Sequence, residues 1–136
     1  MITEQLIQFF LKGSFDYARV KLANSYPRGL DSEVFTFESL KKTYEAAKSE
    51  HEKEHVTPYI YNHPEQFRLY SMENKVDESR YRLTLDTPED WDLISKLYRE
   101  IYTGEIFGWQ DVLNLLQKYP DWVNINSEVP QAHSGE

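Results

Sequence analysis

The segment LDTPEDWDLI, residues 85–94, constrains the fold more than any other stretch, because it has the pattern of a helix start. Thr87 fits the N-cap position, and Pro88 fits the first helical turn, where its missing amide hydrogen costs nothing. Two acidic residues follow, Asp90 among them, and place carboxylates at the positive end of the helix dipole. The apolar residues beyond recur at helical spacing, so the pattern predicts a helix that runs to about Tyr102.

Strand and helix patterns are mixed along the rest of the chain, without a strict strand–helix–strand rhythm. The sequence predicts helices over 3–13, 38–54 and 109–119, strands over 16–22, 32–37 and 56–62, and a hairpin of strands 67–73 and 79–85. In the second helix, Leu40, Tyr44 and Ala47 are expected to face inward. The fold class that follows is α/β, with a mixed sheet and flanking helices.

A single α/β domain is predicted over residues 1–126, followed by a polar, flexible tail over 127–136. The formal net charge of −8 argues against a nucleic-acid partner, because phosphate contacts need clustered basic residues. There is no cysteine, which excludes disulfides and thiolate metal sites. No apolar stretch approaches the ~20 residues that cross a bilayer, so the sequence predicts a cytoplasmic protein without a membrane partner.

One motif resembles a zinc-peptidase site: His51-Glu52-x-x-His55 has the spacing that puts two histidines on one helix face. Glu73 or Glu78 would be candidates for a third ligand. The surrounding residues are almost wholly charged, and a catalytic zinc needs a dry, supported shell around its ligands. A solvated helix end is therefore the favoured interpretation, and a zinc hydrolase is a minor alternative.

Three other positions are candidates for ligand contacts. Asp86 lies between a predicted strand and a helix, where it would either hold Mg²⁺ through oxygen or cap backbone amides. Arg28 stands in the loop NSYPRGLD, residues 24–31, and would bind a carboxylate or phosphate or remain a surface arginine. His55, before the predicted strand 56–62, could donate to an acidic or hydroxylated ligand.

Four segments together resemble one family: DYARVKLANSYPRGLDSEVFTFESL, EHVTPYIYNHPEQFRL, YRLTLDTPEDWDLISKLY and a closing VNIN. They are similar to the C-terminal half of the spore coat polysaccharide biosynthesis protein F family. That family is related to the acylneuraminate and keto-deoxy-octulosonate cytidylyltransferases. The resemblance covers roughly residues 1–126, and its short motifs are specific when taken jointly.

The resemblance implies the C-terminal portion of a nucleotide-diphospho-sugar transferase fold of the glycosyltransferase-A type. The implied reaction joins a CMP group from CTP to an acidic sugar, with Mg²⁺ at the triphosphate. By the same resemblance, Asp86 is the expected metal ligand, and Arg28, Asp31 and His55 are expected to line the sugar side of the site.

The glycine- and arginine-bearing nucleotide loop of that family, and its first metal-binding aspartate in a GDCPL-like turn, do not occur in this sequence. The chain is therefore expected to be a truncated or split cytidylyltransferase-like protein, without transferase activity by itself. It is expected to form a homo-oligomer or to associate with a chain that carries the missing N-terminal half. A non-catalytic binding or assembly module that retains part of the fold is the alternative.

Overall fold

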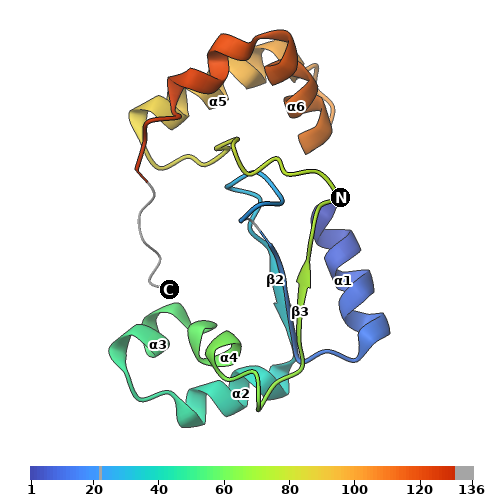
Figure 1. Ribbon diagram of the computed structural model, residues 1–136, viewed down its shortest axis with the longest axis vertical. Helices are drawn as coiled ribbons and strands as arrows, with labels where there is room; N and C mark the ends of the chain where they lie inside the picture. Colours follow the sequence, from blue (N-terminus) through green and yellow to red (C-terminus); the bar gives the residue numbers. More distant parts are fainter. Residues whose placement is uncertain (22, 131–136) are drawn as a thin grey trace.

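The computed structural model describes residues 1–21 and 23–130, apart from the side chain of His51. The chain begins with helix α1 (Ile2–Gly13) and the strands β1 (Tyr17–Val20) and β2 (Glu33–Phe35). Three helices follow, α2 (Phe37–Ala46), α3 (Glu50–His55) and α4 (Pro58–Asn62), and then strand β3 (Leu69–Met72). The last elements are the helices α5 (Pro88–Ile101) and α6 (Trp109–Lys118) and the 3₁₀ helix η1 (Pro120–Ile125). Figure 1 shows α5 and α6 beyond one end of the strands, and α2, α3 and α4 around the other end.

β1 is the central strand of a sheet with the order β2–β1–β3. It runs antiparallel to β2, which places Arg19 opposite Glu33, and parallel to β3, which places Ala18 opposite Tyr70. One neighbour of each direction makes the sheet mixed. The predicted α/β fold with a mixed sheet and flanking helices is therefore confirmed, and the sheet is small.

Successive residues of β1 point to opposite faces of the sheet, as strand geometry requires. Ala18 and Val20 face α1 and form a buried cluster with Leu6 and Phe10 of that helix and with Met72 of β3. Because each of these side chains is at most 9% exposed, this cluster fixes α1 on one face of the sheet (Figure 1).

The opposite face of β1 carries Tyr17, which is 1% exposed. Its ring packs in a second buried cluster with Tyr59 and Ile60 of α4 and with Phe67. This cluster anchors the second layer of helices against the sheet.

A third buried cluster joins α5, α6 and η1, and its buried members are Tyr81, Leu93, Leu97, Val112, Leu113 and Leu116. Trp109 packs against this cluster and also against the cluster under α1. The ring of Trp109 meets Tyr26 edge-on, with 5.6 Å between the ring centroids. Trp109 therefore connects the α5–α6 layer to the sheet.

The prediction of a strand over residues 56–62 is wrong, because helix α4 occupies most of them. Pro58 stands in the first turn of this helix, where a missing amide hydrogen is tolerated. A helix also lets the adjacent residues Tyr59 and Ile60 bury their side chains together. In a strand, those two side chains would point to opposite faces.

The hairpin predicted from residues 67–85 is also wrong, because only its first half forms a strand of the sheet. In its second half, Arg82 makes an isolated parallel bridge to Arg28, in the loop between β1 and β2. The connection is diverted by Ser25, whose hydroxyl oxygen accepts a 2.6 Å hydrogen bond from the backbone amide of Asn74. The segment therefore pairs with a loop rather than with its neighbour in sequence.

The single helix predicted over residues 38–54 is two helices, α2 and α3. Ser49 restarts the helix, since its hydroxyl accepts from the amide of Glu52 while the Glu52 carboxylate accepts from the amide of Ser49. Tyr44 was expected to face inward but is 86% exposed, and Thr43 is buried in its place.

The helix predicted from Thr87 is confirmed: the Thr87 hydroxyl accepts from the amide of Asp90, and Pro88 is the first residue of α5. Residues 131–136 of the predicted polar tail lie outside the described residues, so the tail and the domain boundary at residue 126 stay predictions. None of the helices formed by residues 1–21 and 23–130 is long and apolar enough to span a membrane.

Candidate functional site

At the start of α5, Asp90 is completely buried and bound to Arg82. Arg82 Nε donates to Asp90 Oδ1 and Arg82 Nη2 donates to Asp90 Oδ2, each over 2.9 Å. This two-pronged geometry is the strong form of an arginine–carboxylate pair. Because a buried carboxylate without a partner is very unfavourable, the pair fixes the position of Arg82 against the helix.

Three further groups donate to the Asp90 carboxylate. The hydroxyl of Thr84 lies 2.7 Å from Oδ2, the backbone amide of Asp86 lies 3.0 Å from Oδ2, and the side-chain amide of Asn126 lies 2.8 Å from Oδ1. Burial acts to raise the pKa of Asp90, but these hydrogen bonds and those from Arg82 outweigh it and hold the pKa well below its usual range. Asp90 is therefore an ionised structural anchor.

The anchor holds the backbone of Asp86 while leaving its carboxylate in solvent. The side chain of Asp86 is 72% exposed, and its Oδ2 lies 3.5 Å from Arg82 Nη2. Among the described residues, Arg82 is the only group that donates to this carboxylate. The amide-capping role open to Asp86 falls instead to Thr87, so the structure leaves the Asp86 oxygens available to a ligand.

The loop that carries Arg28 is joined through its backbone to the segment that leads to Asp86. The Arg28 amide donates to the carbonyl oxygen of Tyr81 over 2.9 Å, and the Leu83 amide donates to the carbonyl oxygen of Arg28 over 2.8 Å. Gly29 has a φ of 91°, and a Cβ atom there would stand 2.3 Å from the Leu83 carbonyl oxygen. Only glycine combines that conformation with such a close approach.

Asp31 lies in the same loop as Arg28, three residues after it, whereas His55 lies in a second region. Asp31 is exposed and comes two residues before Glu33, the first residue of β2. His55 is the last residue of α3, and Thr57 beside it donates from its hydroxyl to Glu33 Oε1 over 3.4 Å. Helix α3 and helix α5 lie near opposite ends of the strands in Figure 1. The structure thus joins Arg28 to the Asp86 segment and links the turn after His55 to β2 through Thr57, while the ligand roles of Arg28, Asp31, His55 and Asp86 stay predictions.

The backbone at Val56, directly after His55, is strained. Its φ of 61° and ψ of −57° lie outside the regions that a β-branched residue normally adopts. The Thr57 amide donates to the His55 carbonyl oxygen over 2.6 Å, which closes a three-residue γ-turn of the less common hand. Such strain persists only where the surroundings impose it, and it is concentrated at functional positions.

The zinc-peptidase motif has a structural explanation in its glutamate. Glu52 Oε2 accepts from the backbone amides of Lys48 and Ser49, each over 3.1 Å, and so caps the start of α3. The side chain of His51 lies outside the described residues. Within the part of the chain that the structure describes, no three histidine, aspartate or glutamate side chains are grouped to hold a metal ion. The helix cap therefore gives Glu52 a structural role that needs no metal.

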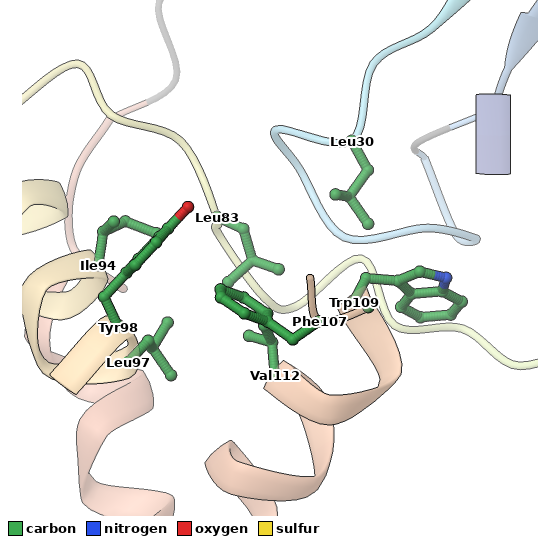
Figure 2. Close-up of a pocket in the computed structure, with 9 residues that line it drawn as sticks. Leu30, Leu83, Ile94, Leu97, Tyr98, Phe107, Trp109 and Val112 are labelled. Atoms are coloured by element: carbon green, nitrogen blue, oxygen red, sulfur yellow. The ribbon is translucent and has the colours of Figure 1, made fainter. Parts of the chain in front are cut away.

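Beside the Arg28 loop lies an apolar pocket of about 260 Å³. Leu30, from the loop, and Leu83 form one side, and α5 and the segment around Phe107 form the other (Figure 2). Tyr98, Phe107 and Trp109 supply its aromatic walls. None of the predicted site residues lines it.

The sequence analysis did not identify Arg82, Thr84 or Asn126. Asp90 was noted only as a charge at a helix start, a position where acidic residues are common. Its partners lie six, eight and thirty-six residues away, and the sequence contains no periodic signal that unites them.

Comparison with known proteins gives a consistent result. The sequence model of a family described as cytidylyltransferase matches residues 12–114. A solved structure described as a cytidylyltransferase from Leptospira borgpetersenii superposes with a TM-score of 0.83 at 27% identity, covering 97% of this chain and 55% of that one.

Two curated relatives were found as well. An uncharacterized protein of Methanocaldococcus jannaschii is 35% identical over 132 residues, which is 96% of this chain and 53% of the relative. The spore coat polysaccharide biosynthesis protein SpsF of Bacillus subtilis is 37% identical over 71 residues, which is 51% of this chain and 30% of that protein. The chain thus spans about half the length of its first relative and of the matching solved structure.

Proposed function

Since the chain belongs to the cytidylyltransferase family, we propose that it takes part in transferring a CMP group from CTP to an acidic sugar. The partial match to SpsF supports a place in the synthesis of a surface or spore-coat polysaccharide. The acceptor side of the site is assigned to Arg28, Asp31 and His55, and the metal ligand to Asp86.

The observation that carries this proposal is the exposed carboxylate of Asp86 on a rigid support. Four donors around Asp90, including the amide of Asp86 itself, fix the backbone at the start of α5. A carboxylate that is exposed but held in place can bind a ligand without the cost of ordering a loop. Arg82, at 3.5 Å, limits the directions in which the carboxylate can turn.

Asp86 fits a magnesium ion in the chemistry of its donor, since Mg²⁺ takes oxygen ligands and commonly uses one or two carboxylates together with water and phosphate oxygens. When bound, Mg²⁺ would neutralise charge on the triphosphate and the leaving pyrophosphate. The protein's own contribution is to hold Asp86 at one edge of the site and to orient the acceptor with Arg28 and its neighbours.

The finer proposal concerns how the site is completed. We assign the chain to the C-terminal half of a glycosyltransferase-A type fold, in which the site for CTP is completed by a part that corresponds to the remaining length of its relatives. A second polypeptide would supply that part, or else the chain would form a homo-oligomer. On this proposal the 136-residue chain alone binds substrate without turning it over.

The test is a thermal-shift titration with CTP and Mg²⁺, run beside an assay of pyrophosphate release. Asp86→Asn should abolish any shift that depends on Mg²⁺. Asp92→Asn, at an exposed position of α5, is the matched control and should leave the shift intact.

The outcomes separate the candidate functions. Binding of sugar acids without any effect of CTP and Mg²⁺ would favour the non-catalytic binding module. Binding of neither CTP nor a sugar acid would overturn the proposal. Stoichiometric zinc in the purified protein, lost in His55→Ala, would favour the hydrolase instead.

A further inference from the structure

Arg19 and Glu33 stand directly opposite each other on β1 and β2, at the end of the pair that opens into the Arg28 loop. Both side chains are exposed, and both belong to the same face of the sheet as Tyr17. Residues opposite each other in antiparallel strands have Cβ atoms about 5 Å apart. An arginine and a glutamate in this arrangement would be expected to form an ion pair.

They do not form one: among the ion pairs of residues 1–21 and 23–130, none joins Arg19 to Glu33. Glu33 Oε1 instead accepts a 2.6 Å hydrogen bond from the buried Tyr17 hydroxyl and a 3.4 Å hydrogen bond from Thr57. The Arg19 guanidinium lies over the ring of Tyr61, with its central carbon 5.1 Å from the ring centroid. Each charge is therefore held by its own neighbours.

Two opposite charges held side by side but unpaired suit a ligand that carries complementary groups. A guanidinium offers a fork of donors that matches a carboxylate, and stacking on an aromatic ring leaves that fork free. A carboxylate accepts hydrogen bonds from hydroxyl groups. Only one oxygen of Glu33 is used by the described residues, so Oε2 is available to a ligand hydroxyl.

We propose that Arg19 and Glu33 form the recognition site for the acidic sugar, with Arg19 binding its carboxylate and Glu33 accepting from its hydroxyls. This inference rests on the proposed function and names the groups that would select the acceptor. It accounts for the strained turn at Val56, because that turn delivers Thr57 to Glu33 and sets His55 beside the same region. Asp31, two residues before Glu33, extends the same edge.

The experiment measures binding to the full chain by ligand-observed NMR and isothermal titration calorimetry. The probes are keto-deoxy-octulosonate and N-acetylneuraminate, the methyl ester of N-acetylneuraminate, in which the carboxylate is blocked, and the neutral sugar N-acetylmannosamine. The wild type should prefer the acids to the ester and to the neutral sugar.

Arg19→Met should weaken binding of the acids roughly tenfold, by loss of a charge-assisted pair, and should leave the weak binding of the ester unchanged. Glu33→Gln should weaken acid and ester alike. Arg99→Met and Glu38→Gln, at exposed positions of α5 and α2, are the matched controls and should bind like the wild type. Circular dichroism melting of each variant reports whether it is folded.

Acid binding by the wild type that Arg19→Met and Glu33→Gln leave unchanged would overturn this inference while the proposed function stood. Equal binding of acid and ester by the wild type would also overturn it. If the wild type bound none of the sugars, the proposed function would fail, and the inference would fail with it. If Arg19→Met proved unfolded, Arg19→Lys would replace it, and Glu33→Asp would likewise replace Glu33→Gln. Binding should then weaken for the same probes as expected for the original variant.

Discussion

Arg82 and Asp90 meet through two hydrogen bonds of 2.9 Å, and the carboxylate between them has no exposed surface. Asp90→Asn removes the charge from that pair and leaves the largely buried Arg82 guanidinium with only the exposed Asp86 carboxylate, 3.5 Å away, as a counter-charge. Loss of one partner from a buried pair costs about 3 kcal/mol of unfolding free energy. Urea denaturation followed by circular dichroism measures it, and Asp92→Asn should change the value by less than about 0.5 kcal/mol. A loss as small as that of the control would mean that the pair does not anchor α5.

The same carboxylate makes stability depend on pH. Because the pKa of Asp90 in the folded protein lies below its ordinary value of 3.8, its ionised form contributes stability above that pH. The contribution is lost as the pH falls from about 4 toward the folded pKa. The free energy of unfolding should therefore decrease on acidification, and Asp90→Asn should reduce that decrease. Denaturation curves from about pH 6 to about pH 3 provide the comparison, and parallel curves for wild type and variant would refute the assignment.

Gly29 is expected to be intolerant of any side chain. Gly29→Ala combines a φ of 91° with a Cβ atom 2.3 Å from the Leu83 carbonyl oxygen. The variant should therefore lose more than about 1 kcal/mol of unfolding free energy. Gly104 is the matched control, since its φ is 100° but nothing lies within 4 Å of its Cβ position. Thermal denaturation should show a clearly larger loss for Gly29→Ala than for Gly104→Ala. Equal losses would show that backbone conformation, rather than contact with Leu83, controls the site.

At Val56 the usual ranking of alanine above glycine should be reversed. A positive φ costs an L-residue roughly 1 kcal/mol or more, and glycine does not incur that cost. Val56→Gly should therefore be more stable than Val56→Ala by about 1 kcal/mol. Chemical denaturation of the two variants, which both lack the valine side chain, gives the difference. Greater stability of the alanine variant would mean that the turn is not held in this conformation in solution.

Asp86→Asn should separate ligand binding from folding. The side chain is 72% exposed and caps nothing in the described structure, so the melting temperature without ligand should be unchanged. Only the effect of CTP with Mg²⁺ should disappear. A variant that melts lower than the wild type in the absence of ligand would point to a structural role for this carboxylate.

Local signals predicted the parts of the fold that depend on local chemistry. Thr87 and Pro88 start α5 where the sequence indicated, because a cap and a proline act within one helical turn. The strands at Tyr17–Val20 and Glu33–Phe35 also lie within their predicted ranges. The strand predicted over residues 56–62 was wrong because aromatic and β-branched residues favour strands only in a suitable tertiary context.

The site was less predictable because its geometry depends on distant partners. Asp86 and Arg28 were selected as candidates, but nothing local indicates that Arg28 pairs with Arg82 through the backbone. Likewise, the role of Asp90 depends on Asn126, thirty-six residues later in the chain. Contacts of this kind arise only when the whole chain has folded.

The backbone hydrogen bonds at Arg28 have a dynamic consequence. The Arg28 amide donates to the carbonyl oxygen of Tyr81, and the Leu83 amide donates to the carbonyl oxygen of Arg28. Neither amide hydrogen can therefore exchange with water until the two backbone segments separate. In hydrogen–deuterium exchange, the amides of Arg28 and Leu83 would then open as one cooperative unit. A ligand bound to the Arg28 loop would therefore slow exchange both in that loop and in the segment that leads from Tyr81 to the start of α5.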